Sequence, residues 1–131
     1  MISFERFKLD GASPIYLQIL LHIKRGVIAG TVRDGDALPS RRVLSALLGV
    51  NPNTVQKAYR LLEEEGLIQS HSGAKSEMVL DEGKVRRIRT ELVEADAREA
   101  VQRLKEMGLS KEEVFSLIER HWEGGEVHEE D

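Results

Sequence analysis

The side chains best suited to chemistry in this sequence are amides, a hydroxyl and two cations within residues 51–60. They are Asn53, Thr54, Gln56, Lys57 and Arg60. An amide carries a donor beside an acceptor, which matches the edge of an adenine base in the DNA major groove, while cations suit phosphates. The grouping therefore predicts a surface that binds double-stranded DNA. The sequence shows no nucleophile with a base, phosphate loop or carboxylate dyad at useful spacing, so it does not predict an enzyme.

A helix over residues 52–65 must hold this grouping. Asn51 is a good N-cap because its side-chain oxygen can accept a first-turn amide, and Pro52 suits the first helical position. Apolar residues at helical spacing predict a buried stripe of Val55, Ala58, Tyr59 and Leu62. Gly66 can take the left-handed conformation that ends a helix. We expect Asn51 to cap this helix whether or not it also contacts phosphate.

A second helix is expected just before the first, capped by Ser40. Its apolar stripe is Leu44, Leu47 and Leu48. Arg41 and Arg42 occupy its first turn, where the helix dipole disfavours cations. Such a placement needs a partner, and phosphate is one candidate. Because Gly49-Val50 makes a short turn between the two helices, the pattern predicts a helix-turn-helix.

The remaining elements of this domain flank the two helices. Ser13 is expected to cap a further helix, which begins at Pro14, has apolar residues at helical spacing and ends at Gly30. The other expected elements are a very short strand at 36–38 and strands 67–69 and 77–80 joined by a loop at 70–76. This small polar loop is predicted to form a wing.

The C-terminal third predicts a helical hairpin. A long helix begins near Gly83 and closes at Gly108, and Ser110 with Glu113 forms a capping box for a second helix. A hairpin with two apolar stripes cannot bury both by itself, so we expect a homodimer. The predicted dimerisation residues are Ile88, Leu92, Val101, Leu104, Phe115, Ile118 and Trp122.

Composition sets wide limits on function. The 131 residues carry a net charge of −4, but residues 11–80 hold eight Lys/Arg against six Asp/Glu, so the acid lies in the C-terminal part. With no cysteine, disulfides and thiolate metal sites are excluded. The lack of a long apolar run or signal pattern predicts a cytoplasmic protein. His121 beside Glu119 and Glu123 is not a metal-ligand set.

Three motifs together resemble the winged-helix head of GntR-family bacterial transcription regulators. They are Pro14-Ile-Tyr-Leu-Gln-Ile19, Leu38-Pro-Ser-Arg-Arg-Val-Leu44 and Gly49-Val-Asn-Pro-Asn-Thr-Val-Gln-Lys-Ala-Tyr59 with its continuation to Ile68. The short helical C-terminal part resembles the YtrA-like subgroup. This resemblance implies a homodimeric operator-binding regulator, commonly a repressor and often linked to transporter genes. We expect no cofactor.

The resemblance also implies roles for individual residues. Arg42 matches a second-helix arginine that contacts DNA, and the recognition-helix contact positions are matched by Asn51, Asn53, Thr54 and Gln56. Gly73 matches the wing glycine that enters the minor groove. Ser72 stands where many members have a basic residue, and His71 or Lys75 could take over that role. Arg41, Lys57 and Arg60 complete the predicted DNA-binding set.

The sequence leaves several alternatives open. The fold could serve as a protein–protein interaction module without DNA binding, or the head could belong to an enzyme-linked regulator, since some GntR relatives add a pyridoxal-phosphate aminotransferase-like domain. With 131 residues, the chain is not expected to hold such a domain. A basic cluster formed by Lys84, Arg86, Arg87 and Arg89 could clamp phosphate or be a solvated helix face.

The predicted fold class is mainly α (α+β), a winged helix-turn-helix followed by a two-helix dimerisation hairpin. The expected divisions are an arm at 1–13, the DNA-binding domain at 14–80, the dimerisation region at 81–123 and a disordered acidic tail at 124–131.

Overall fold

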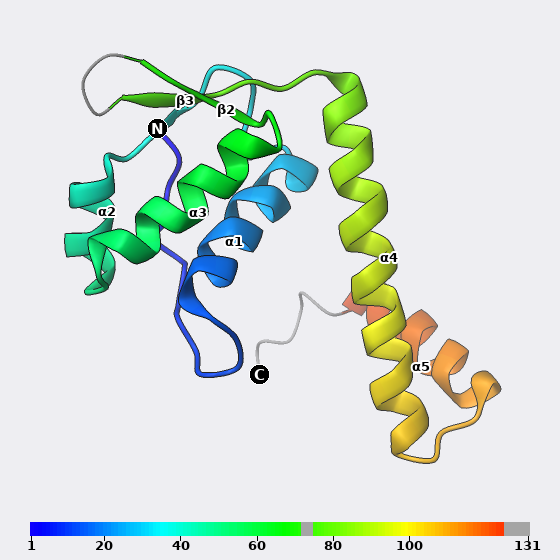
Figure 1. Cartoon of the computed structure of the whole chain (residues 1–131). Coiled ribbons are helices and arrows are strands. Elements are labelled where there is room, and N and C mark those ends of the chain that lie inside the picture. The colour runs from blue at the N-terminus through cyan, green and yellow to red at the C-terminus, as the bar shows by residue number, and fades with distance from the viewer. Residues whose placement is uncertain (72–74, 125–131) are drawn as a thin grey trace. The chain divides into compact units, whose positions relative to one another are not determined.

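The computed structural model describes residues 1–71 and 75–124, and within them it contains five helices and a three-stranded sheet (Figure 1). The helices are α1 (Ile15–Ala29), α2 (Arg41–Leu48), α3 (Pro52–Glu64), α4 (Glu82–Glu106) and α5 (Lys111–Gly124). The strands are β1 (Ala37–Leu38), β2 (Ile68–Ser70) and β3 (Ser76–Met78). The chain divides into two compact units, Met1–Leu92 and Val93–Asp131. The predicted mainly helical α+β class is confirmed.

The core of the first unit lies between α1, α2 and α3. The apolar stripes of these helices face inward because their residues recur every three or four positions. Fully buried members are Ile19, Ile23, Leu44, Val55, Ala58 and Leu62, each 0% exposed. Figure 1 shows α1 and α3 packed side by side, with α2 against the N-terminal part of α3. The core therefore holds α3 by one face and leaves its other face outside.

The sheet is antiparallel with the strand order β1-β3-β2. Leu38 pairs with Ser76, and Ile68 pairs with Met78, so the central strand β3 joins the segment before α2 to the segment after α3. The wing strands lie one or two residues from the predicted ranges. The loop between β2 and β3 begins at His71, whose backbone N–H donates to the carbonyl of Lys75 at 2.8 Å.

The N-terminal arm is part of the first unit. Ile2 and Phe4 are 5% and 6% exposed and belong to the core. The backbone N–H of Ile2 donates to the Ala37 carbonyl at 2.8 Å, beside the outer strand β1. Phe4 and Phe7 lie 4.7 and 4.9 Å from the His22 ring, centroid to centroid. The arm predicted at the N-terminus therefore packs back on the domain, against α1 and β1.

The second unit contains the end of α4 and all of α5. The predicted capping box is confirmed, since Glu113 N–H donates to Ser110 Oγ at 3.1 Å and Ser110 N–H donates to Glu113 Oε1 at 2.9 Å. Gly108 ends the turn after α4 with a φ of 83°. Of the segment expected to be an acidic tail, Gly124 is the last residue of α5, and residues 125–131 lie outside the described residues.

Three expectations need correction. Ile88 and Leu92 are 1% and 8% exposed within a single chain and belong to the core of the first unit, so they are not available as dimerisation residues. The first unit accordingly extends into α4 as far as Leu92 instead of ending at residue 80. At α1, Pro14 itself is the N-cap, and no side chain caps this helix.

Candidate nucleic-acid interface

Helix α3 has one buried face and one polar face. Val55, Ala58 and Leu62 are 0% exposed, whereas Asn53, Lys57 and Arg60 are exposed. Thr54 and Gln56 are half-buried on the flank between these faces. The side chains of Asn53 and Gln56 make no hydrogen bond to another described residue. The structure thus leaves amide donors and acceptors available to an external partner.

Asn51 fixes the beginning of α3. Its side-chain Oδ1 accepts a hydrogen bond from the Asn53 backbone N–H at 2.7 Å, and Pro52 fills the first helical position. The cap satisfies a backbone donor that would otherwise lack a partner in the first turn. The predicted capping role of Asn51 is confirmed, and its contact with phosphate stays a prediction.

The two arginines at the start of α2 differ in their surroundings. Arg42 is exposed and has no side-chain partner among the described residues. Arg41 is half-buried with its guanidinium carbon 5.6 Å from the centroid of the Tyr59 ring, and its Nε is buried without a hydrogen-bond partner in the described chain. Arg41 therefore contributes to the α2–α3 contact, and Arg42 is the better placed of the two for an external anion.

Tyr59 connects the two helices of the helix-turn-helix. Its hydroxyl donates to the Pro39 carbonyl at 2.7 Å, just before the Ser40 cap of α2. Tyr59 is 1% exposed, and this burial raises its pKa well above the ordinary value, while nearby Arg41 partly opposes the shift. The phenol thus stays neutral and holds the start of α2 against α3.

The remaining predicted cations have weak surface partners. Lys57 Nζ lies 4.1 Å from the centroid of the Tyr16 ring, and Arg60 Nε lies 3.8 Å from Glu64 Oε2. His71 Nε2 is 3.3 Å from Glu77 Oε2. An exposed ion pair such as Arg60–Glu64 contributes little to stability, so Arg60 can exchange Glu64 for phosphate at low cost. Lys75 is exposed, and Gly73 lies outside the described residues.

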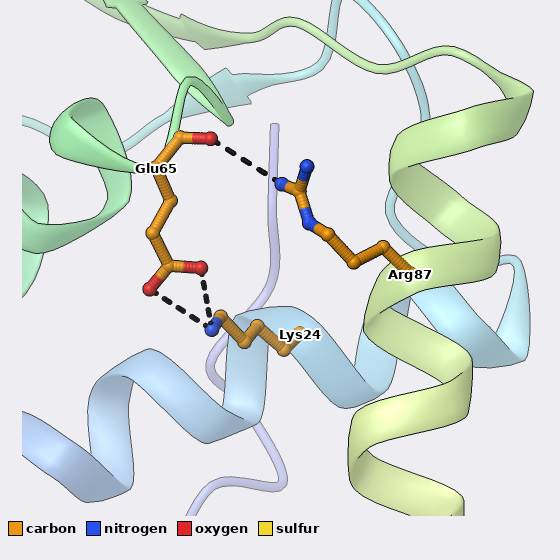
Figure 2. A network of polar contacts seen from close by, with 3 residues as sticks. All are labelled: Lys24, Glu65 and Arg87. Atoms are coloured by element: carbon orange, nitrogen blue, oxygen red, sulfur yellow. Dashed lines mark hydrogen bonds and ion pairs between the residues drawn. The ribbon is translucent and has the colours of Figure 1, made fainter.

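The C-terminal end of α3 has a polar network that the sequence did not predict (Figure 2). Lys24 of α1 is 7% exposed, and its Nζ donates to both carboxylate oxygens of Glu65 at 2.8 and 3.1 Å. From α4, Arg87 Nη2 donates to the Glu65 carbonyl at 3.4 Å and Lys84 Nζ donates to the Gly66 carbonyl at 2.6 Å. Neither interpretation of the basic cluster, phosphate clamp or solvated face, anticipated bonds from Lys84 and Arg87 to protein carbonyls.

No group of three or more His, Asp or Glu side chains in residues 1–71 and 75–124 is placed to hold a metal ion. Over the same residues, each helix is too short or too polar to span a bilayer.

A recognition helix presented beside a second helix and followed by a two-stranded hairpin defines a winged helix-turn-helix domain. The chain belongs to the GntR family of bacterial regulatory proteins, whose family model matches residues 15–75. Its relatives are transcriptional regulators and not enzymes.

Individual relatives cover most of the chain. The uncharacterized HTH-type transcriptional regulator YhcF of Bacillus subtilis is 34% identical over 123 residues, which are 90% of this chain and 98% of YhcF. The HTH-type transcriptional repressor YtrA of the same organism is 39% identical over 87 residues, 62% of this chain and 67% of YtrA. A GntR family transcriptional regulator from Listeria monocytogenes has a similar structure, with a TM-score of 0.73, 28% identity and coverage of 86% of this chain and 98% of its own.

Proposed function

We propose that this regulator binds a specific double-stranded DNA operator as a homodimer and acts as a repressor. The observation that carries the proposal is the exposed polar face of α3, where Asn53 and Gln56 lack partners in the described chain while the opposite face is fully buried. Amide side chains on such a face can bond base edges bidentately in a major groove. A helix held by a rigid core can place them with a defined register.

Cations around α3 supply the contacts that carry no sequence information. Arg42 lies at the start of α2 and Lys57 lies on the exposed side of α3, where the usual docking of this motif brings phosphates. His71 and Lys75 flank the wing loop and are proposed to approach the backbone there. In this arrangement Arg41 plays mainly a packing role. Binding should weaken as salt rises, because phosphate contacts release counterions.

The homodimer is proposed from the second unit, where α5 has no buried residue within the described chain. Phe115, Ile118 and Trp122 recur every three or four residues and are 58%, 46% and 76% exposed, and Val101 of α4 is 50% exposed. An apolar stripe of this size is rarely left in water. A second copy would cover it and give the two heads the symmetry of an inverted repeat.

Repression is proposed from the relatives, since YtrA of Bacillus subtilis is named a repressor. A transporter operon is proposed as a candidate target because the family resemblance implies it.

The test is selection of bound fragments from a random DNA pool, followed by affinity measurements on the recovered sequence. We expect an inverted repeat. Arg42→Ala should weaken binding by about 1–3 kcal/mol if Arg42 contacts a base, and should mainly reduce the salt dependence if it contacts phosphate. Arg103→Ala, which removes an exposed cation of the second unit, should leave both the DNA affinity and its salt dependence unchanged. Equal affinity of the wild type and Arg42→Ala at every salt concentration would contradict both roles.

One observation favours the alternative of a protein–protein interaction module. Val43 and Leu47 on α2 are 55% and 64% exposed, one helical turn apart. Val43 also borders a groove of about 510 Å³ that His71 and Lys75 line as well. If the selection recovers no DNA and a partner protein binds independently of salt, this alternative replaces the regulator proposal, and Val43→Ser with Leu47→Ser should abolish that binding.

A further inference from the structure

The first turns of α4 are bonded to the C-terminal end of the recognition helix α3. Glu65 is the C-cap of α3, and Gly66 follows it with a φ of 76°. The backbone N–H groups of Gly66 and Leu67 donate back to Glu63 and Leu62 at 3.0 and 2.9 Å. This termination satisfies two carbonyls inside the helix and leaves the carbonyls of Glu65 and Gly66 pointing outward.

Two cations of α4 bond to these outward carbonyls. Lys84 Nζ donates to Gly66 O at 2.6 Å and to Val79 O at 3.2 Å, and Arg87 Nη2 donates to Glu65 O at 3.4 Å. Their positive charges also suit the negative end of the α3 dipole. Lys84 itself is held in place, because its backbone N–H donates to Asp81 Oδ1 at 2.8 Å in the first turn of α4.

The same end of α3 is also anchored to α1. The Glu65 carboxylate receives both bonds of Lys24, which is almost fully buried. Figure 2 shows the Glu65 side chain turned to Lys24 and its carbonyl turned to Arg87. Residue 65 thus ties the end of α3 both to α1 and to the base of α4.

We propose that Lys84 and Arg87 are positioning residues for operator recognition, which hold the base of α4 on the end of α3 and so determine which spacing of half-sites the dimer accepts. The inference rests on the proposed homodimer and its inverted-repeat operator. Within one head, the polar face of α3 is unaffected by these side chains. Their loss should therefore alter the choice of spacing more than the affinity for one half-site.

The experiment compares wild type with Lys84→Met/Arg87→Met on two kinds of DNA. One is a single half-site, and the other is a set of inverted repeats whose spacer is lengthened or shortened by one and two base pairs. We expect the affinity of the variant for a single half-site to stay within about twofold of wild type. Its preference for the best spacer over the altered ones should fall roughly tenfold, because a tenfold change corresponds to the loss of one hydrogen bond from a charged donor. Arg86→Met/Arg89→Met is the matched control, since it removes the same charge from the same turns without touching α3.

An equal spacing preference in the two double variants would overturn the inference. If Lys84→Met/Arg87→Met does not fold, Arg87→Met alone, at the exposed end of the network, should show a smaller loss of preference that Arg87→Lys partly restores. An Arg87→Met protein with unchanged preference would overturn the inference as well. Failure of the wild type to bind any of the inverted repeats would instead refute the proposed function, and with it this extension.

Discussion

Removing the Tyr59 hydroxyl isolates the contribution of one buried bond between the two DNA-binding helices. The hydroxyl donates to the Pro39 carbonyl at 2.7 Å, a good length for an O–H···O bond, and Tyr59 is 1% exposed. In Tyr59→Phe the buried Pro39 carbonyl loses this donor, because phenylalanine has no hydroxyl. The variant should therefore lose about 1–2 kcal/mol of unfolding free energy at pH 7.

The pH dependence of this effect gives a second readout. Burial raises the folded-state pKa of Tyr59 above its unfolded value of about 10. Above pH 10 the unfolded phenol releases its proton while the folded one keeps it, so alkali favours unfolding. The stability that Tyr59 contributes is complete below pH 10 and is lost as pH rises through the folded-state pKa, by at most about 1.4 kcal/mol per unit. The gap between wild type and Tyr59→Phe should therefore narrow above pH 10.

Urea unfolding followed by circular dichroism from pH 7 to 11 measures both effects, provided the slope with urea is the same for both proteins. Tyr16→Phe is the matched control, because Tyr16 is half-buried and its hydroxyl has no partner among the described residues. This control should change stability by less than about 0.5 kcal/mol. A Tyr59→Phe protein as stable as wild type at pH 7, or a gap independent of pH, would refute the reasoning.

Three further predictions concern a helix end, a cap and the exposed stripe. Gly66→Ala should destabilise the first unit by about 1 kcal/mol in urea, because residue 66 has a φ of 76°, whereas Gly11→Ala should be nearly neutral. Ser110→Ala should destabilise α5 by about 1 kcal/mol, because the helix loses its N-cap, and the loss should appear as reduced helicity on heating. If Ser110→Thr, which keeps the hydroxyl, retained no more helicity than Ser110→Ala, the prediction would be contradicted. Trp122→Ser should raise the dimer dissociation constant roughly 30-fold in sedimentation, as for loss of about 2 kcal/mol at an aromatic anchor, and an unchanged constant would argue against α5 as the interface.

Much of the fold follows from local signals that are readable in the chain. Asn51-Pro52 begins α3, and Ser110 with Glu113 begins α5, because a cap needs only a side chain and a backbone group a few residues apart. The exposed amides of α3 follow from the same logic, since a helix that buries the stripe from Val55 to Leu62 must turn its opposite face outward.

Only the tertiary structure decided which partner each face and cation would meet. The stripe on α4 gave no sign that Ile88 and Leu92 pack into the first unit, because an apolar stripe is equally suited to its own chain or to a second copy. Arg41 and Arg42 are adjacent, yet only Arg41 lies over Tyr59. Lys24 and Glu65 are 41 residues apart, and no local pattern pairs them. Such contacts depend on how whole helices pack, which short-range spacing does not encode.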